Sequence, residues 1–112
     1  MKAERGNLVL PSWSFSDGLV VPPDVMSRVM GEESVLLNLK TTVYFGADSV
    51  ASQMWTTLTQ ADTIQAAFES LLAVYEVTPK VLRCDLEEFI QQLLDHGLIE
   101  IKRSDTPGEK VV

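Results

Sequence analysis

The chain has 112 residues, which is the size of one compact domain, and its hydrophobic fraction of 46% is enough for a core. Nine basic residues against sixteen acidic ones give a formal net charge of -7. This charge argues against nucleic acid as a partner, because nucleic-acid binding depends on neutralising phosphates. No apolar run approaches the roughly 20 residues of a membrane span, and the apolar stretch near the N-terminus is too short for a signal peptide. The single cysteine excludes an internal disulfide framework, so we expect a cytoplasmic protein that binds neither membranes nor nucleic acid.

The N-terminal segment has no regular apolar period, although it contains Trp13 and Phe15. We interpret it as an extended arm that ends at Pro22-Pro23. Such an arm could cover a sheet edge, pair with a second copy or lie loose. The expected division of the chain is an arm, a main domain and a flexible polar tail, over residues 1–22, 23–102 and 103–112.

Three short segments have the composition of β-strands. The first, Val25–Met30, is rich in β-forming residues and is followed by a turn at Gly31. The second, Ser34–Lys40, alternates with the period of a half-buried strand. The third, Val43–Phe45, follows a turn that has neither Gly nor Asn, and Gly46 is expected to end it. Together they predict a three-stranded antiparallel meander.

Three helices are expected after these strands. Asp48 is the expected N-cap of the first helix, and Asp62 with Gln65 resembles a capping box that opens the second. Thr78 followed by Pro79 opens the third. Each helix has an apolar stripe at helical spacing: Ala51, Met54, Trp55 and Leu58; then Ile64, Phe68, Leu71, Leu72 and Tyr75; then Leu82, Leu86, Phe89, Ile90, Leu93 and Leu94. Beyond the third helix, residues 98–101 are expected to add a short strand or to pack on the core.

The side chains do not predict a catalytic or metal site. The single cysteine and the single histidine, Cys84 and His96, both fall on the third helix. They are twelve positions apart, or about 18 Å along the helix, which is too far for a nucleophile and its base. One Cys and one His cannot complete a tetrahedral zinc site. We therefore interpret Cys84 as a small buried or half-buried filler and His96-Gly97 as the end of the helix, and we predict no catalytic residue, metal or cofactor.

Three strands followed by three capped helices is the order of a small winged helix-turn-helix-like domain of the α+β class. Six stretches in this order resemble a known family. They are Gly31-Glu32-Glu33-Ser34-Val35-Leu36-Leu37-Asn38-Leu39, Val43-Tyr44-Phe45-Gly46, Met54-Trp55, Leu71-Leu72-Ala73-Val74-Tyr75-Glu76-Val77, Leu82 to Leu86 and His96-Gly97-Leu98-Ile99. Through them, the stretch from Val25 to Ile101 resembles the PqqD family, the chaperone of pyrroloquinoline quinone biosynthesis and its relatives, which are also called RiPP recognition elements. The chain departs from the family pattern where Thr41-Thr42 and Ala51 stand in place of glycine.

The resemblance implies a non-catalytic protein that binds the leader segment of a ribosomally synthesised precursor peptide. The peptide would add as a strand along the third strand and lie in the groove between that strand and the third helix. Asp85 and Glu88 would pair with a basic leader residue, and one of Tyr44 and Phe45 is expected to belong to the core. The implied peptide-binding residues are Val43, Tyr44, Phe45, Val81, Cys84, Asp85, Glu88 and Gln92.

Several alternatives remain open at this point. The enzyme that receives the peptide would be a lasso-peptide leader protease with its cyclase, or a radical SAM maturase. The residues Leu37-Asn38-Leu39 with Tyr44-Phe45-Gly46 look more like the versions that accompany leader proteases. A winged-helix DNA-binding regulator shares the architecture, but residues 80–96 carry two basic residues against four acidic ones. A structural subunit of a larger complex is the third alternative, and the oligomeric state is left open.

Overall fold

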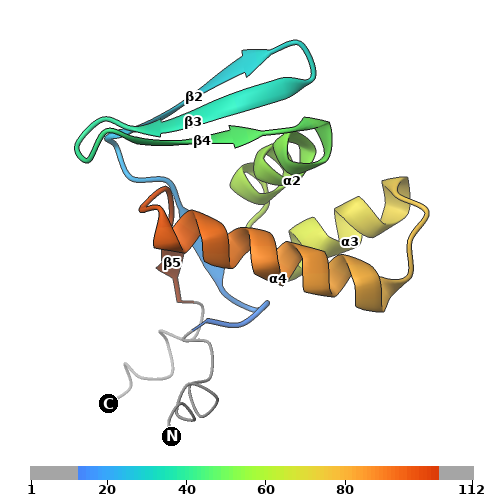
Figure 1. Ribbon diagram of the computed structural model, residues 1–112. Helices are drawn as coiled ribbons and strands as arrows, with labels where there is room; N and C mark the ends of the chain where they lie inside the picture. Colours follow the sequence, from blue (N-terminus) through green and yellow to red (C-terminus); the bar gives the residue numbers. More distant parts are fainter. Residues whose placement is uncertain (1–12, 104–112) are drawn as a thin grey trace, which may run out of the picture.

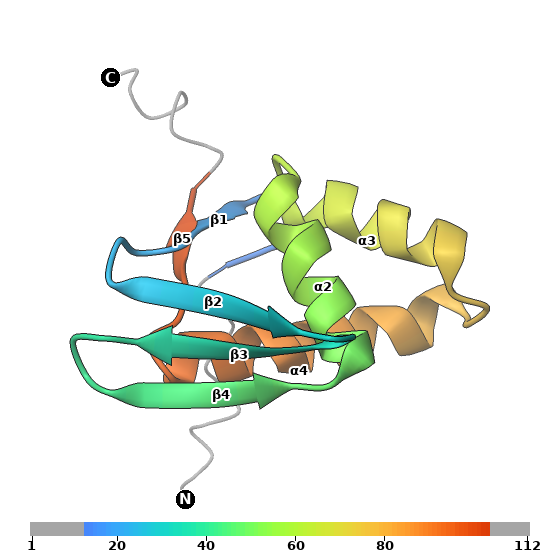
Figure 2. The same ribbon diagram turned by 90° about the horizontal axis from the view of Figure 1, so that it is seen from above.

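The computed structural model describes residues 13–103. Three strands, β2 (Val25–Met30), β3 (Glu33–Asn38) and β4 (Val43–Ala47), form an antiparallel sheet in the order β2-β3-β4. Three helices follow, α2 (Ser49–Gln60), α3 (Ile64–Val74) and α4 (Pro79–Asp95), and they lie on one side of the sheet (Figures 1 and 2). The short strands β1 (Gly18–Val20) and β5 (Glu100–Lys102) pair with each other in a separate antiparallel ribbon. The predicted α+β architecture of a sheet followed by three helices is confirmed.

The meander is built by two turns of different kinds. Met30 pairs with Glu33, which leaves a two-residue turn in which Gly31 has a φ of 69°, a left-handed conformation that glycine adopts without cost. The second turn contains Thr42 with a φ of 60°, where glycine would again be the ordinary residue. The strand bounds differ slightly from those expected: β4 continues through Gly46, because Gly46 still pairs with Val35.

The core lies between the inner face of the sheet and the helices. Leu36 of β3 points into this core and is fully buried. The apolar stripes of the helices meet it, as their spacing predicted, although Leu72, Tyr75 and Leu94 are only partly buried. The other residues of the core with less than 2% of their surface exposed are Ile64, Ala67, Leu71, Leu86, Ile90, Leu93 and Leu98.

The helix ends follow the expected capping chemistry with one exception. The Asp48 Oδ1 atom accepts a 2.9 Å hydrogen bond from the Ala51 N–H, and Thr78 caps α4 in the same way. The N-cap of α3, however, is Thr63 and not Asp62, because the Thr63 hydroxyl accepts a 3.0 Å bond from the Ala66 N–H. The capping-box assignment was therefore wrong by one residue. His96 is the C-cap of α4, and Gly97 follows with a φ of 70°.

The described part of the N-terminal segment packs against the helices. Trp13 and Phe15 are buried in the core, and the Phe15 ring meets Phe68 edge-on at 5.7 Å. The carbonyl oxygens of Asp17 and Phe15 accept hydrogen bonds of 2.8 and 2.7 Å from the N–H groups of Ile64 and Gln65, which begin α3. These two donors have no partner inside the helix, so the segment satisfies them from outside. At the other end of the domain, Leu98 and Ile99 are buried in the core and β5 pairs with β1. Residues 98–101 were expected to pack on the core or to add a short strand, and the structure shows both.

Candidate functional site

Strand β4 is an edge of the three-stranded sheet. It pairs with β3 on one side, and within residues 13–103 no strand pairs with its other side. Alternate residues of an antiparallel edge strand direct their N–H and C=O groups away from the sheet. Tyr44, the second residue of β4, is 70% exposed on the face of the sheet away from the helices. The free side of β4 is therefore a template on which another extended segment can pair.

The side chains on the inner face of β4 point toward α4. Phe45 is half-buried, and its ring lies 6.1 Å from the ring of Phe89 and 5.5 Å from that of His96, centroid to centroid. Helix α4 runs beneath the β3–β4 side of the sheet (Figures 1 and 2). The free edge of β4 is thus bordered by a partly exposed aromatic surface on the helix side. Tyr44 points to the opposite face, so Phe45 is the core member of the pair, as the alternation of a strand requires.

A hollow of about 310 Å³ lies between α4 and the start of α2, next to the end of β4. Phe89 and Met54 supply apolar surface in it, and both belong to the core. Three carboxylates line the same hollow, and no ion pair forms to them among the described residues. The complete lining is Asp48, Val50, Ala51, Met54, Asp85, Glu88, Phe89 and Gln92. An apolar surface surrounded by unpaired carboxylates favours a ligand group that is apolar along its length and cationic at its end.

The structure brings together only part of the predicted site. Asp85, Glu88 and Gln92 line the hollow, while Val43 and Phe45 belong to the inner face of β4. Val81 and Cys84 lie nearer the N-terminus of α4, are exposed and do not line the hollow.

The interpretation of Cys84 as a buried filler was wrong, because its side chain is exposed. It follows the buried Leu82 by two positions, which is about 200° around the helix and therefore on the other face.

Some residues of the hollow were not predicted. One is Phe89 of α4, which the sequence assigned to the core, and the others come from α2 and the residue before it, namely Asp48, Val50, Ala51 and Met54. The sequence marks Asp48 as a cap and Met54 as core, and nothing in their spacing shows that α2 begins beside α4.

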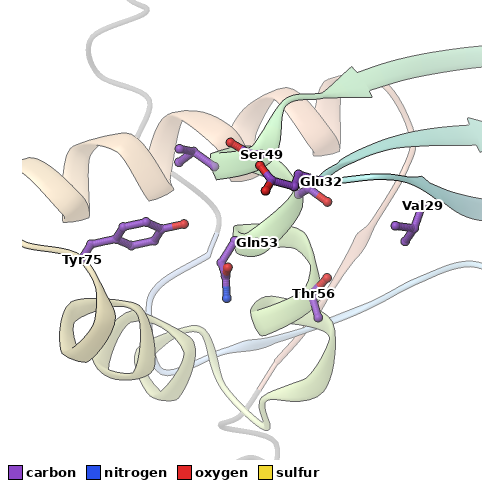
Figure 3. Close-up of a pocket in the computed structure, with 8 residues that line it drawn as sticks. Val29, Glu32, Ser49, Gln53, Thr56 and Tyr75 are labelled. Atoms are coloured by element: carbon purple, nitrogen blue, oxygen red, sulfur yellow. The ribbon is translucent and has the colours of Figure 1, made fainter.

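A second hollow, of about 520 Å³, lies on the other side of α2 (Figure 3). Tyr75 reaches toward Ser49 and Gln53 of α2, with Glu32 and Val29 of the β2–β3 hairpin opposite (Figure 3). Burial, together with the negative charge of Asp48, raises the pKa of the Tyr75 hydroxyl above its usual value. The hollow borders the β2 side of the sheet, which is the competing edge for an added strand, and most of its lining residues are polar. Tyr75 is the one aromatic residue in its lining, whereas the rings of Phe45, Phe89 and His96 lie together beside β4.

Side chains that could bind a metal ion do not cluster in the described part of the chain. No group of three or more His, Cys, Asp or Glu side chains within residues 13–103 is placed to hold a metal ion. The ring nitrogen Nδ1 of His96 lies 2.7 Å from the carbonyl oxygen of Gln92, which fixes this ring at the helix end. No helix in this part of the chain is both long and apolar enough to cross a membrane. The geometry is that of a binding surface.

Comparisons with known proteins agree with this geometry. The model of the family described as coenzyme PQQ synthesis protein D (PqqD) matches residues 33–99. The solved structure of TbiB1 in complex with the TbiA(beta) leader peptide is similar to this chain, with 31% sequence identity and a TM-score of 0.67. The match covers 71% of this chain and 93% of that one. No curated protein matches the chain significantly. The region matched by the family model includes β3, β4 and the three helices, and therefore all elements that border the edge of β4 and the hollow on α4.

Proposed function

Because the chain belongs to the PqqD family, we propose that it is a non-catalytic recognition protein that binds the leader segment of a ribosomally synthesised precursor peptide. The observation that carries this proposal is the free edge of β4 beside the aromatic and acidic surface of α4. The similarity to TbiB1, whose structure contains a leader peptide, supports it.

The leader binds by strand addition. Its main chain completes the ladder on the open side of β4, and these hydrogen bonds supply affinity that depends little on sequence. Every second leader side chain then points toward α4, where it meets Phe45, Phe89 and the hollow. The remaining leader side chains stand beside Tyr44 on the opposite face of the sheet.

Specificity comes from the hollow at the end of the groove. A leader side chain that enters it is desolvated against Met54 and Phe89 and ends near Asp85 and Glu88. A Lys or Arg, which has an aliphatic stem and a cationic end, matches both features. The preferred leader therefore carries a basic residue in a stretch that is otherwise apolar.

The bound leader is presented to a modifying enzyme, which is a leader protease with its cyclase or a radical SAM maturase. The recognition protein holds the precursor, and the enzyme supplies the chemistry. Since the precursor is made by ribosomes, the proposed place of action is the cytoplasm.

The DNA-binding alternative has little support in the surface of α4. Arg83, one of the two basic residues on this helix, stacks over the Phe15 ring at 4.1 Å and lies 3.9 Å from a carboxylate oxygen of Glu87. The Arg83 side chain therefore packs against the protein and does not extend toward a DNA partner. The remaining cation of this helix, Lys80, is outnumbered by Asp85, Glu87, Glu88 and Asp95, and such an acidic surface repels phosphate.

Binding of a fluorescently labelled leader peptide, measured by fluorescence polarisation, tests the proposal. The double variant Asp85→Lys/Glu88→Lys reverses the charge of the hollow without touching the buried stripe of α4. We expect it to bind a leader with a basic residue at least about tenfold more weakly, which corresponds to about 1.4 kcal/mol.

The matched control is Glu69→Lys/Glu76→Lys, which makes the same change in net charge at exposed positions outside the hollow. We expect this control to bind within about twofold of the wild type, apart from a small long-range effect that salt screens. Equal loss in both double variants would assign the effect to net charge alone. Absence of leader binding by the wild type would contradict the proposed function.

A further inference from the structure

The face of the sheet that points away from the helices is apolar and exposed. The strand register places Met26, Leu37 and Tyr44 in one row across the sheet, and Arg28, Val35 and Gly46 in the next. Met30 extends the same face along β2. Figures 1 and 2 show the three helices on the other side of this sheet. We call this surface the outer face; its residues are Met26, Arg28, Met30, Val35, Leu37 and Tyr44, and Glu33, the partner of Met30, lies at its border.

The composition of the outer face is that of an interaction surface. Met26, Met30 and Tyr44 are 54%, 58% and 70% exposed, and Val35 and Leu37 fill the space between them. All except Tyr44 line a shallow hollow of about 490 Å³ together with Ser27. Contiguous apolar patches on soluble proteins mark interaction sites, and Met, Tyr and Arg are enriched at the centres of such sites. A sheet face that was only exposed to solvent would carry mainly polar side chains.

We propose that the outer face docks the enzyme that modifies the bound peptide. This inference rests on the proposed function and adds the place where the enzyme sits. A leader strand added to β4 extends the sheet, so every second leader side chain stands beside Tyr44 and continues the outer face. An enzyme on this face therefore contacts the recognition protein and the leader at the same time, while the groove on α4 stays occupied by the other leader side chains.

Arg28 shows what the occupant must carry at one position. It lies on the edge strand β2, between Met26 and Met30 on the outer face, and forms no ion pair with any residue from 13 to 103. A second copy of this chain also carries a carboxylate beside this face, on Glu33, so the oligomeric state is one outcome of the test. A buried guanidinium needs a partner. The surface that fits is thus apolar with a carboxylate placed opposite Arg28.

The test uses the full-length protein, the leader peptide and the purified peptide-modifying enzyme encoded beside the precursor gene. Two variants alter the outer face, Met26→Ser/Met30→Ser and Arg28→Glu. The control Val74→Ser removes an equally exposed apolar side chain, 64% exposed, at the end of α3. Biolayer interferometry measures binding of the enzyme, fluorescence polarisation measures binding of the leader, and circular dichroism checks the fold.

We expect both outer-face variants to bind the enzyme at least about tenfold more weakly and the leader within about twofold of the wild type. The Val74→Ser control should match the wild type in both. Unchanged enzyme affinity in the folded variants overturns the docking site, whether or not the leader binds. A wild-type dimer in sedimentation analysis that the outer-face variants abolish also overturns it, because a second copy then occupies the face. Failure of the leader to bind while the enzyme still binds through the outer face contradicts the proposed function only.

Discussion

The side-chain amide nitrogen of Asn38 donates a 2.8 Å hydrogen bond to the carbonyl oxygen of Gly97, joining residues 59 positions apart. Asn38 ends β3, and Gly97 follows the end of α4. The Oδ1 atom of the same side chain accepts hydrogen bonds from the N–H groups of Lys40 and Thr41. One buried side chain thus shapes the turn that leads into β4 and ties that turn to the end of the helix that forms the other wall of the groove.

Replacing Asn38 by Ala should therefore lower both stability and leader affinity. The change leaves the Gly97 carbonyl and two turn N–H groups without these partners, and we expect a loss of about 1–3 kcal/mol in the free energy of unfolding. Urea unfolding followed by circular dichroism measures it. The variant Asn38→Asp keeps the acceptor for the turn and loses the donor to Gly97, so it isolates the link between the turn and the helix. An Asn38→Ala protein as stable as the wild type would show that the turn does not depend on this side chain.

Thr42 is expected to be a site of stabilisation. Its φ of 60° places a β-branched residue in the left-handed region, where the side chain is strained. Thr42→Gly relieves this strain, and after the entropy that glycine adds to the unfolded chain we expect a net gain of about 0.5–1 kcal/mol. The control is Thr41→Gly, at a neighbouring position without positive φ, which should destabilise. Urea unfolding measures both variants. A higher midpoint for Thr41→Gly with a lower midpoint for Thr42→Gly would contradict this explanation of the turn.

Phe15 should be as important for stability as a core residue of the helices. It is 6% exposed, packs edge-on against Phe68 and carries the Arg83 guanidinium over its ring. Phe15→Ala should cost about 3–5 kcal/mol by leaving a cavity, and Phe15→Leu clearly less. Arg83→Ala removes the guanidinium that stacks on the Phe15 ring and should lower the free energy of unfolding by about 0.5–1 kcal/mol. Thermal unfolding measures all three, and a Phe15→Ala protein that melts like the wild type would show that residues 13–20 do not contribute to the domain.

We predict that the protein does not act as a winged-helix DNA-binding regulator. The acidic α4 and the engagement of Arg83 with Phe15 leave this helix without the cations that a recognition helix needs. We expect no sequence-specific shift of duplex DNA in a gel assay at physiological salt, even with micromolar protein. A shift that persists with competitor DNA, and that Lys80→Glu removes, would favour a DNA-binding regulator.

The fold was predictable from the sequence where local chemistry decides it. Alternation in Ser34–Lys40 predicted a strand, because one face of β3 is buried and the other is not. The caps Asp48 and Thr78 predicted the starts of two helices, because each cap bonds an N–H group three residues further along the chain. The cap of α3 was misplaced since Asp62 and Thr63 are both good caps, and the choice between them depends on packing. Asp62 lies where the N-terminal segment crosses: a Cβ atom on Gly18 would be 2.6 Å from the Asp62 carbonyl oxygen.

The candidate site was predictable only in part. The family resemblance pointed to β4 and to Asp85, Glu88 and Gln92, and these helix residues share a hollow in the structure. Met54 and Asp48 were not foreseen as part of it, since their approach to α4 depends on how α2 packs and leaves no periodic signal. Cys84 was misjudged because burial was inferred from residue type and not from its position around the helix.

Hydrogen exchange of the backbone amides, followed by NMR with and without the leader peptide, tests strand addition at β4 most directly. The account predicts that leader binding slows exchange of alternate amides within Val43–Ala47, the ones that point away from β3, and leaves the amides of Val25–Met30 unchanged. Protection that appears along β2 beside the hollow at Tyr75, with β4 unaffected, would contradict it.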